Sequence, residues 1–232
     1  GARMLTNILL KTTEADKDFR KVVIGNMKAI ARTGDEELDV MCVLCLCLAS
    51  QSESCRTTIV QSGMLKLIDG NTIFSDSTIS FAYITMFSNI ANNPLMRTKV
   101  LDDKVIERFQ KICVIKDIQL DLAIAKALYC VSCSPENIPK LVEQNIVPFI
   151  STIYAEGYAE ESLTAGSRPD EVIQQLIACL FNISTCLEVQ NKIVCQGFVS
   201  LMVKLWPFAL KNFKMCCLAY LSICQLACGR TN

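Results

Sequence analysis

Two short sequence patterns recur along this chain with one shared period, and this recurrence limits the possible folds more than any other feature. The first pattern is an apolar pair, two variable residues, a Gly, Asn or Lys, and then an apolar residue. We call the Gly, Asn or Lys the hinge, and the five hinges are Asn26, Gly63, Lys104, Asn145 and Gly197. The second pattern is an apolar segment ending in a polar–apolar–small triplet, and the triplets begin at Cys47, Asn89, Cys130, Asn182 and Gln225. Both patterns keep a period near 42 residues, which predicts an α-solenoid of stacked helical repeats.

Within each period, the spacing of apolar residues predicts a short helix, a hinge, a second helix and a long third helix. The long third helices are expected at about 36–50, 76–92, 117–133, 170–186 and 212–228. The repeats then cover about 15–50, 55–92, 94–133, 135–186 and 188–228, and the fourth carries an insertion at 156–169. No segment reads convincingly as a strand, so the predicted fold class is all-α.

Capping residues support these helix boundaries. Acidic residues at Asp35 and Asp117 precede two of the long helices, where they complement the positive end of the helix dipole. Gly63 and Gly197 suit the left-handed conformation that ends a short helix. Two more helix starts are predicted where a capping side chain precedes proline, at Asn93-Pro94 and Ser134-Pro135.

The composition excludes several classes of protein. The chain has 23 basic and 23 acidic residues, and 51% of its residues are apolar. This is too apolar for a disordered chain, and it lacks the basic surplus that nucleic acids and anionic membranes attract. The longest apolar run, 40–49, is half the roughly 20 residues that a membrane-spanning helix needs. No signal peptide opens the sequence, so we expect a cytoplasmic protein, with the nucleus or a cilium as alternatives.

The chemistry of an active site is missing from the sequence. Without histidine the chain cannot form a Ser-His or Cys-His arrangement. The 14 cysteines lie in apolar runs, where they are expected to pack as small apolar residues. Cys42 with Cys45, and Cys130 with Cys133, have zinc-like spacing, but both pairs lie inside predicted long helices and lack a second pair. We therefore expect no enzyme, no cofactor and no metal site.

The period, the glycine hinges and the Asn-Ile-Ala ending that begins at Asn89 together resemble the armadillo repeat family, and HEAT repeats less closely. The resemblance extends from about residue 15 to 228 and is clearest over 176–205. It implies a right-handed superhelix of about five three-helix repeats that forms a single domain over 1–232. Because the first repeat is incomplete and the last helix is apolar on most faces, we expect a fragment of a longer array, or ends covered by further repeats or another subunit.

The resemblance also implies where a partner binds. In the family, the third helices line the concave face, and the first residue of each triplet is usually an Asn whose amide holds the backbone of an extended peptide. The matching positions here are Asn7, Cys47, Asn89, Cys130, Asn182 and Gln225. The alternative interpretation is that these amides only satisfy neighbouring helix ends.

Residues four positions before these amides set the selectivity of the groove in the family. Nuclear-import members carry tryptophan there, and β-catenin-like members carry basic residues. The matching positions here are Val43, Thr85, Lys126, Ala178 and Leu221, so neither mode is supported. The predicted partner-binding residues are Asn7, Asn89, Asn182, Gln225, Thr85 and Lys126.

The sequence thus predicts a non-enzymatic scaffold that binds a protein or an extended peptide. Two alternatives differ in class. One is a myosin-type chaperone module that holds an unfolded client. The other is a structural component of a large assembly such as a ciliary axoneme, in which the apolar ends are permanently covered. The insertion at 156–169 is expected to be a loop, because it is acidic and contains Gly, Ser and Pro.

Overall fold

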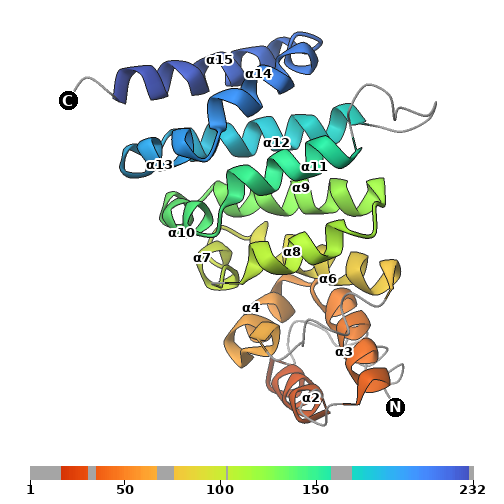
Figure 1. Cartoon of the computed structure of the whole chain (residues 1–232). Coiled ribbons are helices and arrows are strands. Elements are labelled where there is room, and N and C mark those ends of the chain that lie inside the picture. The colour runs from red at the N-terminus through yellow and green to blue at the C-terminus, as the bar shows by residue number, and fades with distance from the viewer. Residues whose placement is uncertain (1–16, 31–34, 67–75, 103, 158–168, 230–232) are drawn as a thin grey trace. The chain divides into compact units, whose positions relative to one another are not determined.

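The computed structural model describes residues 17–30, 35–66, 76–102, 104–157 and 169–229 (Figure 1). Within these ranges every regular element is a helix, and none of the described residues lies in a strand. The all-α class predicted from the sequence is therefore confirmed. The chain divides into two compact units, residues 1–100 and 101–232, and each is described by itself.

The first unit contains two of the long helices that were predicted from the triplets. Its described elements are α2 (Lys17–Ile30), α3 (Glu36–Ala49), α4 (Glu53–Ser62), η1 (Met64–Lys66), α6 (Ser77–Ala91) and α7 (Arg97–Val100). Helix α3 packs along α6, and α2 packs against α4. Apolar side chains from these helices, among them Ile24, Leu46, Ile59 and Phe87, are fully buried between them.

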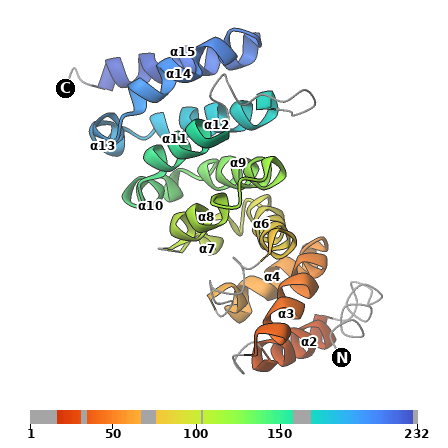
Figure 2. The ribbon, with the colours of Figure 1, turned by 45° about the vertical axis from the view of Figure 1, so that its right-hand side comes forward.

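The second unit repeats one arrangement of helices. Its described elements are α8 (Val105–Cys113), α9 (Ile118–Ser132), η2 (Pro135–Asn137), α10 (Ile138–Glu143), α11 (Ile146–Gly157), α12 (Pro169–Ser184), η3 (Leu187–Val189), α13 (Gln190–Cys195), α14 (Phe198–Ala209) and α15 (Phe213–Cys228). The long helices α9, α12 and α15 pack side by side in one layer, and α8, α11 and α14 form a second layer against them (Figures 1 and 2). The core lies between the two layers.

The positions of the five long helices were predicted to within two residues, and their caps explain why. Asp35 accepts a hydrogen bond from the backbone N–H of Leu38 at 3.2 Å, and Asp117 accepts one from Gln119 at 2.8 Å. Asp76 caps α6 in the same way through the N–H of Thr78, and this bond lowers the pKa of the Asp76 carboxyl. A side chain that accepts from the first turn satisfies N–H groups that have no partner in the helix, and so fixes its start.

Three of the five hinges adopt the left-handed conformation. Gly63 has φ 72°, Gly197 has φ 89° and Asn145 has φ 61°. Lys104 does not, since its φ is −125°. The hinge predicted at Asn26 is wrong, because α2 continues through it. Burial of Val23, Ile24 and Met27 along one face of α2 explains this, since packing outweighs the weak helix propensity of single residues.

The two helix starts predicted at Asn93-Pro94 and Ser134-Pro135 agree with the structure only in part. Asn93 accepts a hydrogen bond from the N–H of Leu95, but the next helix begins later, at Arg97. Ser134 makes no side-chain capping bond, and Pro135 opens a 3-10 turn rather than an α-helix. Most of the insertion predicted at 156–169 lies outside the described residues, which resume at Pro169 where α12 begins.

Candidate functional site

The predicted binding residues lie on the long helices of both units. Asn89 and Thr85 lie one turn apart on α6 in the first unit, and both are half-buried. In the second unit, Lys126 lies exposed on α9, and Asn182 and Gln225 lie half-buried on α12 and α15. The structure brings these last three residues onto helices that pack side by side. Asn7 lies outside the described residues.

Each of the three described amides, Asn89, Asn182 and Gln225, is bonded to a serine at the end of the preceding long helix. Asn89 Nδ2 donates to Ser50 Oγ at 3.0 Å, and Asn182 Nδ2 donates to Ser132 Oγ at the same distance. Gln225 Oε1 lies 2.6 Å from Ser184 Oγ. These serine–amide bonds join neighbouring long helices near their C-terminal ends. The triplet pattern predicted the amides but not the serines, although two of the three serines occupy the last position of a triplet.

The serine hydroxyls also lie within hydrogen-bond distance of backbone carbonyls of their own helices, and this determines whether each amide donates or accepts. Ser132 Oγ donates to the carbonyl of Tyr129 at 2.8 Å, so it is left to accept from Asn182. Ser184 Oγ lies 2.7 Å from the carbonyl of Phe181 and donates to Gln225 Oε1, so its single proton is shared between two acceptors. The amide is therefore the donor at Asn182 and Asn89 and the acceptor at Gln225.

The structure gives these amides a role in holding the long helices together, which predicts an effect on stability. We expect Asn182→Ala to lower the free energy of unfolding by about 0.5–1.5 kcal/mol, because it removes a half-buried interhelix hydrogen bond. This is a fall of roughly 1–6 °C in Tm, at about 2–4 °C per kcal/mol for a chain of this size. The matched control is Asn191→Ala, which changes an exposed asparagine on α13. Equal Tm values for the two variants would show that the bond contributes nothing.

The open surface of the three long helices of the second unit is the candidate binding surface. We call it the third-helix face and define it by three side chains on each of α9, α12 and α15, all of them half-buried or exposed. They are Leu122, Lys126, Cys130, Gln174, Ala178, Asn182, Cys217, Leu221 and Gln225. Only Lys126 among them is charged. The aromatic rings of Tyr129 and Phe181 are also partly exposed beside this face.

A small cavity lies beside the third-helix face, at the N-terminal ends of α12 and α15. Its volume is about 100 Å³, and Ile173, Ile177 and Met215 contribute apolar walls. At its mouth Lys211 Nζ lies 3.7 Å from an Asp170 carboxylate oxygen and 4.9 Å from the centre of the Phe208 ring. The ion pair is exposed and contributes little stability. The cavity is of a size that admits a small side chain.

A second set of side chains, which the sequence patterns did not predict, recurs at the ends of the long helices. Each donates to a backbone carbonyl six residues earlier, at the C-terminal end of a long helix. Arg56 Nε donates to Ser50 at 2.6 Å, Arg97 Nε to Ala91 at 2.9 Å, Asn137 Nδ2 to Val131 at 3.0 Å and Gln190 Nε2 to Ser184 at 3.0 Å. The last carbonyls of a helix have no partner within it, so these donors complete the helix ends. The signal in the sequence is a donor side chain seven to nine residues after the start of each of the first four triplets.

Three of the cysteines that were expected to pack as apolar residues lie in the core. Cys42, Cys45 and Cys179 are almost wholly inaccessible. Burial raises the pKa of the Cys42 thiol to about 11 and that of Cys179 to about 12. A thiol in this environment stays protonated and is a poor nucleophile. Within the described residues, no group of three or more Cys, Asp or Glu side chains is placed to hold a metal ion.

No single described helix is long and apolar enough to cross a membrane. Among the described residues, one pair of consecutive helical segments, 170–184 and 187–195, is long and apolar enough when the two are taken together. The chain bends by 96° between them.

Comparison with known proteins gives a likeness of fold. Neither the protein-family models nor the curated proteins give a match to this chain. A solved structure, the crystal structure of an engineered protein from the Northeast Structural Genomics Consortium, is similar with a TM-score of 0.67 and 19% sequence identity. The alignment covers 98% of this chain and 89% of the engineered protein. At this level of identity the likeness concerns the helical fold alone.

Proposed function

We propose that this chain is an armadillo-like α-solenoid that acts as a non-enzymatic scaffold and binds a protein or an extended peptide. The parallel packing of α9, α12 and α15, with a second helix against each, supports the solenoid. So do the left-handed hinges and the helix-end donors, which recur with the repeat. A stack of such repeats offers a long surface for a partner. The proposed location is the cytoplasm.

The observation that carries the proposal is the chemistry of the third-helix face. Eight of its nine side chains are uncharged, and Leu122, Ala178 and Leu221 are accessible apolar groups. Such a surface favours a partner with apolar side chains, because removing both apolar surfaces from water is the main driving force of association. We expect the half-buried amide of Asn182 to add a hydrogen bond to the backbone of such a partner. A basic signal peptide would find no carboxylate among the nine residues.

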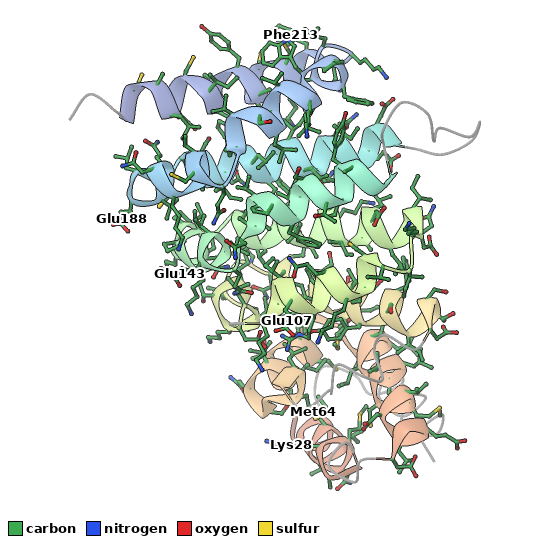
Figure 3. The ribbon with its side chains drawn as sticks, viewed as in Figure 1. Lys28, Met64, Glu107, Glu143, Glu188 and Phe213 are labelled. Carbon is green, nitrogen blue, oxygen red and sulfur yellow. The ribbon has the colours of Figure 1, made fainter. Side chains whose placement is uncertain are left out.

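A structural component of a large assembly is the second candidate function. It is favoured by the outer side of α15, where Phe213 is 85% exposed and Tyr220 60% exposed. Phe213 lies on the side of α15 away from α12 (Figure 3). A chaperone module remains an alternative, for which the described contacts offer no specific support.

The scaffold proposal is tested by selecting ligands and then changing the surface. Peptides from a random phage-displayed library should be enriched on the full chain, and they should carry aromatic or aliphatic residues. We expect Leu221→Asp, in the middle of the third-helix face, to weaken the binding of a selected peptide by about tenfold or more. The matched control is Val203→Asp, an exposed aliphatic residue on α14, which should leave Kd within about twofold.

Fluorescence anisotropy with labelled peptide gives both Kd values. The proposal is wrong if the library yields no enriched peptide. It is also wrong if Val203→Asp and Leu221→Asp weaken binding equally, since the third-helix face would then have no special role.

A further inference from the structure

The cavity between α12 and α15 lies wholly within the second unit and combines buried apolar walls with a polar mouth. Ile173, Ile177 and Met215 form the apolar walls, and all three side chains are buried. The rest of the lining is Asp170, Gln174, Phe208, Lys211 and Asn212. An apolar group that enters the cavity leaves water, which is favourable in proportion to the area it buries.

The volume of the cavity limits which groups can enter it. The cavity holds about 100 Å³, whereas an apolar cavity of about 150 Å³ takes up benzene. An aromatic side chain is therefore too large, and the methyl group of alanine leaves most of the space empty. The groups that fit are the aliphatic side chains of leucine, isoleucine, valine and methionine.

The wall at the mouth is already packed in place. The Tyr154 ring of α11 meets the Phe208 ring of α14 edge-on, with 6.1 Å between the ring centres, and Tyr154 Oη donates to the carbonyl of Lys204 at 3.3 Å. Lys211 Nζ lies over the Phe208 ring, between α14 and Asp170 of α12. A wall that is packed before binding loses little conformational entropy when a ligand arrives.

The mouth offers hydrogen-bond donors to a peptide backbone. Asn212 caps α15, and its Oδ1 accepts from the backbone N–H groups of Lys214 at 3.0 Å and Met215 at 3.3 Å. The oxygen of this amide is therefore used, and its two N–H groups remain to donate. The ammonium group of Lys211 is a second donor beside it. These donors match the backbone carbonyls that flank a bound side chain.

Gln174 makes the cavity continuous with the third-helix face, because it lines the cavity and also belongs to that face. Its amide can donate and accept, so it suits a peptide backbone that passes from one to the other. A partner that lies on the third-helix face can therefore place one of its side chains in the cavity.

We propose that this cavity is the anchor pocket of the third-helix face and takes one aliphatic side chain of the bound protein or peptide, whose flanking backbone carbonyls face Asn212 and Lys211. The inference rests on the proposed scaffold function and adds to it the type of residue that the partner presents. A buried aliphatic side chain should bind at least about tenfold more tightly than alanine at the same place.

The test uses capped single amino acids, because each carries one side chain between two peptide groups and no partner protein is needed. The full chain is labelled with ¹³C at its methionine methyl groups, and the Met215 signal is identified by its loss in Met215→Leu. N-acetyl-leucine amide should shift this signal saturably at millimolar concentration. N-acetyl-alanine amide should bind at least about tenfold more weakly because it leaves the cavity empty. N-acetyl-phenylalanine amide should bind as weakly as the alanine probe, because its ring does not fit.

A matched pair of variants shows whether the leucine probe enters the cavity. Gln174 and Gln175 are both half-buried on α12, but only Gln174 lines the cavity. Gln174→Trp covers the mouth and should weaken binding of N-acetyl-leucine amide by about tenfold or more. Gln175→Trp should leave the Kd within about twofold. Circular dichroism should give the same helical signal for both variants.

The proposal is overturned if N-acetyl-leucine amide leaves the Met215 signal unchanged, or if the phenylalanine probe binds as tightly as the leucine probe. It is also overturned if peptides selected on the full chain bind Gln174→Trp with an unchanged Kd, and the scaffold function itself then stands. The opposite result separates the two proposals. Binding of the leucine probe at Met215 without any enriched peptide supports the aliphatic site and contradicts the scaffold function.

Discussion

Leu176→Ala should lower the free energy of unfolding by about 2–5 kcal/mol, among the largest effects of any single substitution in this chain. Leu176 lies on α12, which packs closely against α9, and its side chain is completely buried. Truncation to Ala loses the free energy gained when the side chain is transferred out of water. It also leaves a cavity that the two helices cannot fill without moving. Urea unfolding followed by circular dichroism measures the change.

The matched control for this variant is Leu187→Ala, because Leu187 is the same residue type and is 72% exposed. Its effect should stay within about 0.5 kcal/mol. Similar losses for the two variants would mean that α9 and α12 are not packed as described. In a stack of repeats the loss should also reach the neighbours, since each repeat is stabilised by its interfaces.

The second large effect concerns alkaline pH. Burial raises the pKa of the Cys179 thiol from 9.0 to about 12, so the folded chain keeps this proton when the unfolded chain has released it. Above about pH 9 the unfolded state therefore binds fewer protons than the folded state, and stability falls as pH rises. The expected loss is about 1.4 kcal/mol for each pH unit until the folded pKa is reached.

Urea unfolding at a series of pH values from 8 to 10.5, with a reductant present, tests this linkage. Cys179→Ala should be less stable at every pH because of its cavity, but above about pH 9 its slope with pH should be shallower by about 1.4 kcal/mol per unit. Identical slopes would show that Cys179 is not responsible. Thiol labelling gives an independent measurement: exposed Cys195 should react rapidly, and Cys179 only when the chain unfolds.

The long helices were predictable because their signals are local. An apolar period fixes each helix, and Asp35 or Asp117 fixes its start through a bond to the next turn. The glycine hinges were predictable for the same reason, since the left-handed conformation at Gly63 or Gly197 depends on that residue alone. The hinge pattern fails at Asn26. Its neighbours on α2 are buried by packing between helices, and a local sequence pattern carries no information about that packing.

The candidate site was less predictable because its chemistry depends on contacts between repeats. The amides at Asn89 and Asn182 could be found from the triplets, but their bonds to Ser50 and Ser132 join residues 39 and 50 positions apart. The role of the amides in binding stays a prediction. The exposure of Tyr220 depends likewise on what packs against α15, which no local pattern records.

The side chains that cap the long helices have a consequence for dividing this chain into pieces. Asn137 and Gln190 each belong to the short helical segment that opens one repeat, yet each completes the end of the long helix in the repeat before it. A truncation at a sequence-repeat boundary such as 133 or 186 therefore strips the final helix of its donor. The smallest self-sufficient folding module is offset from the sequence repeat and reaches at least one short segment into the next.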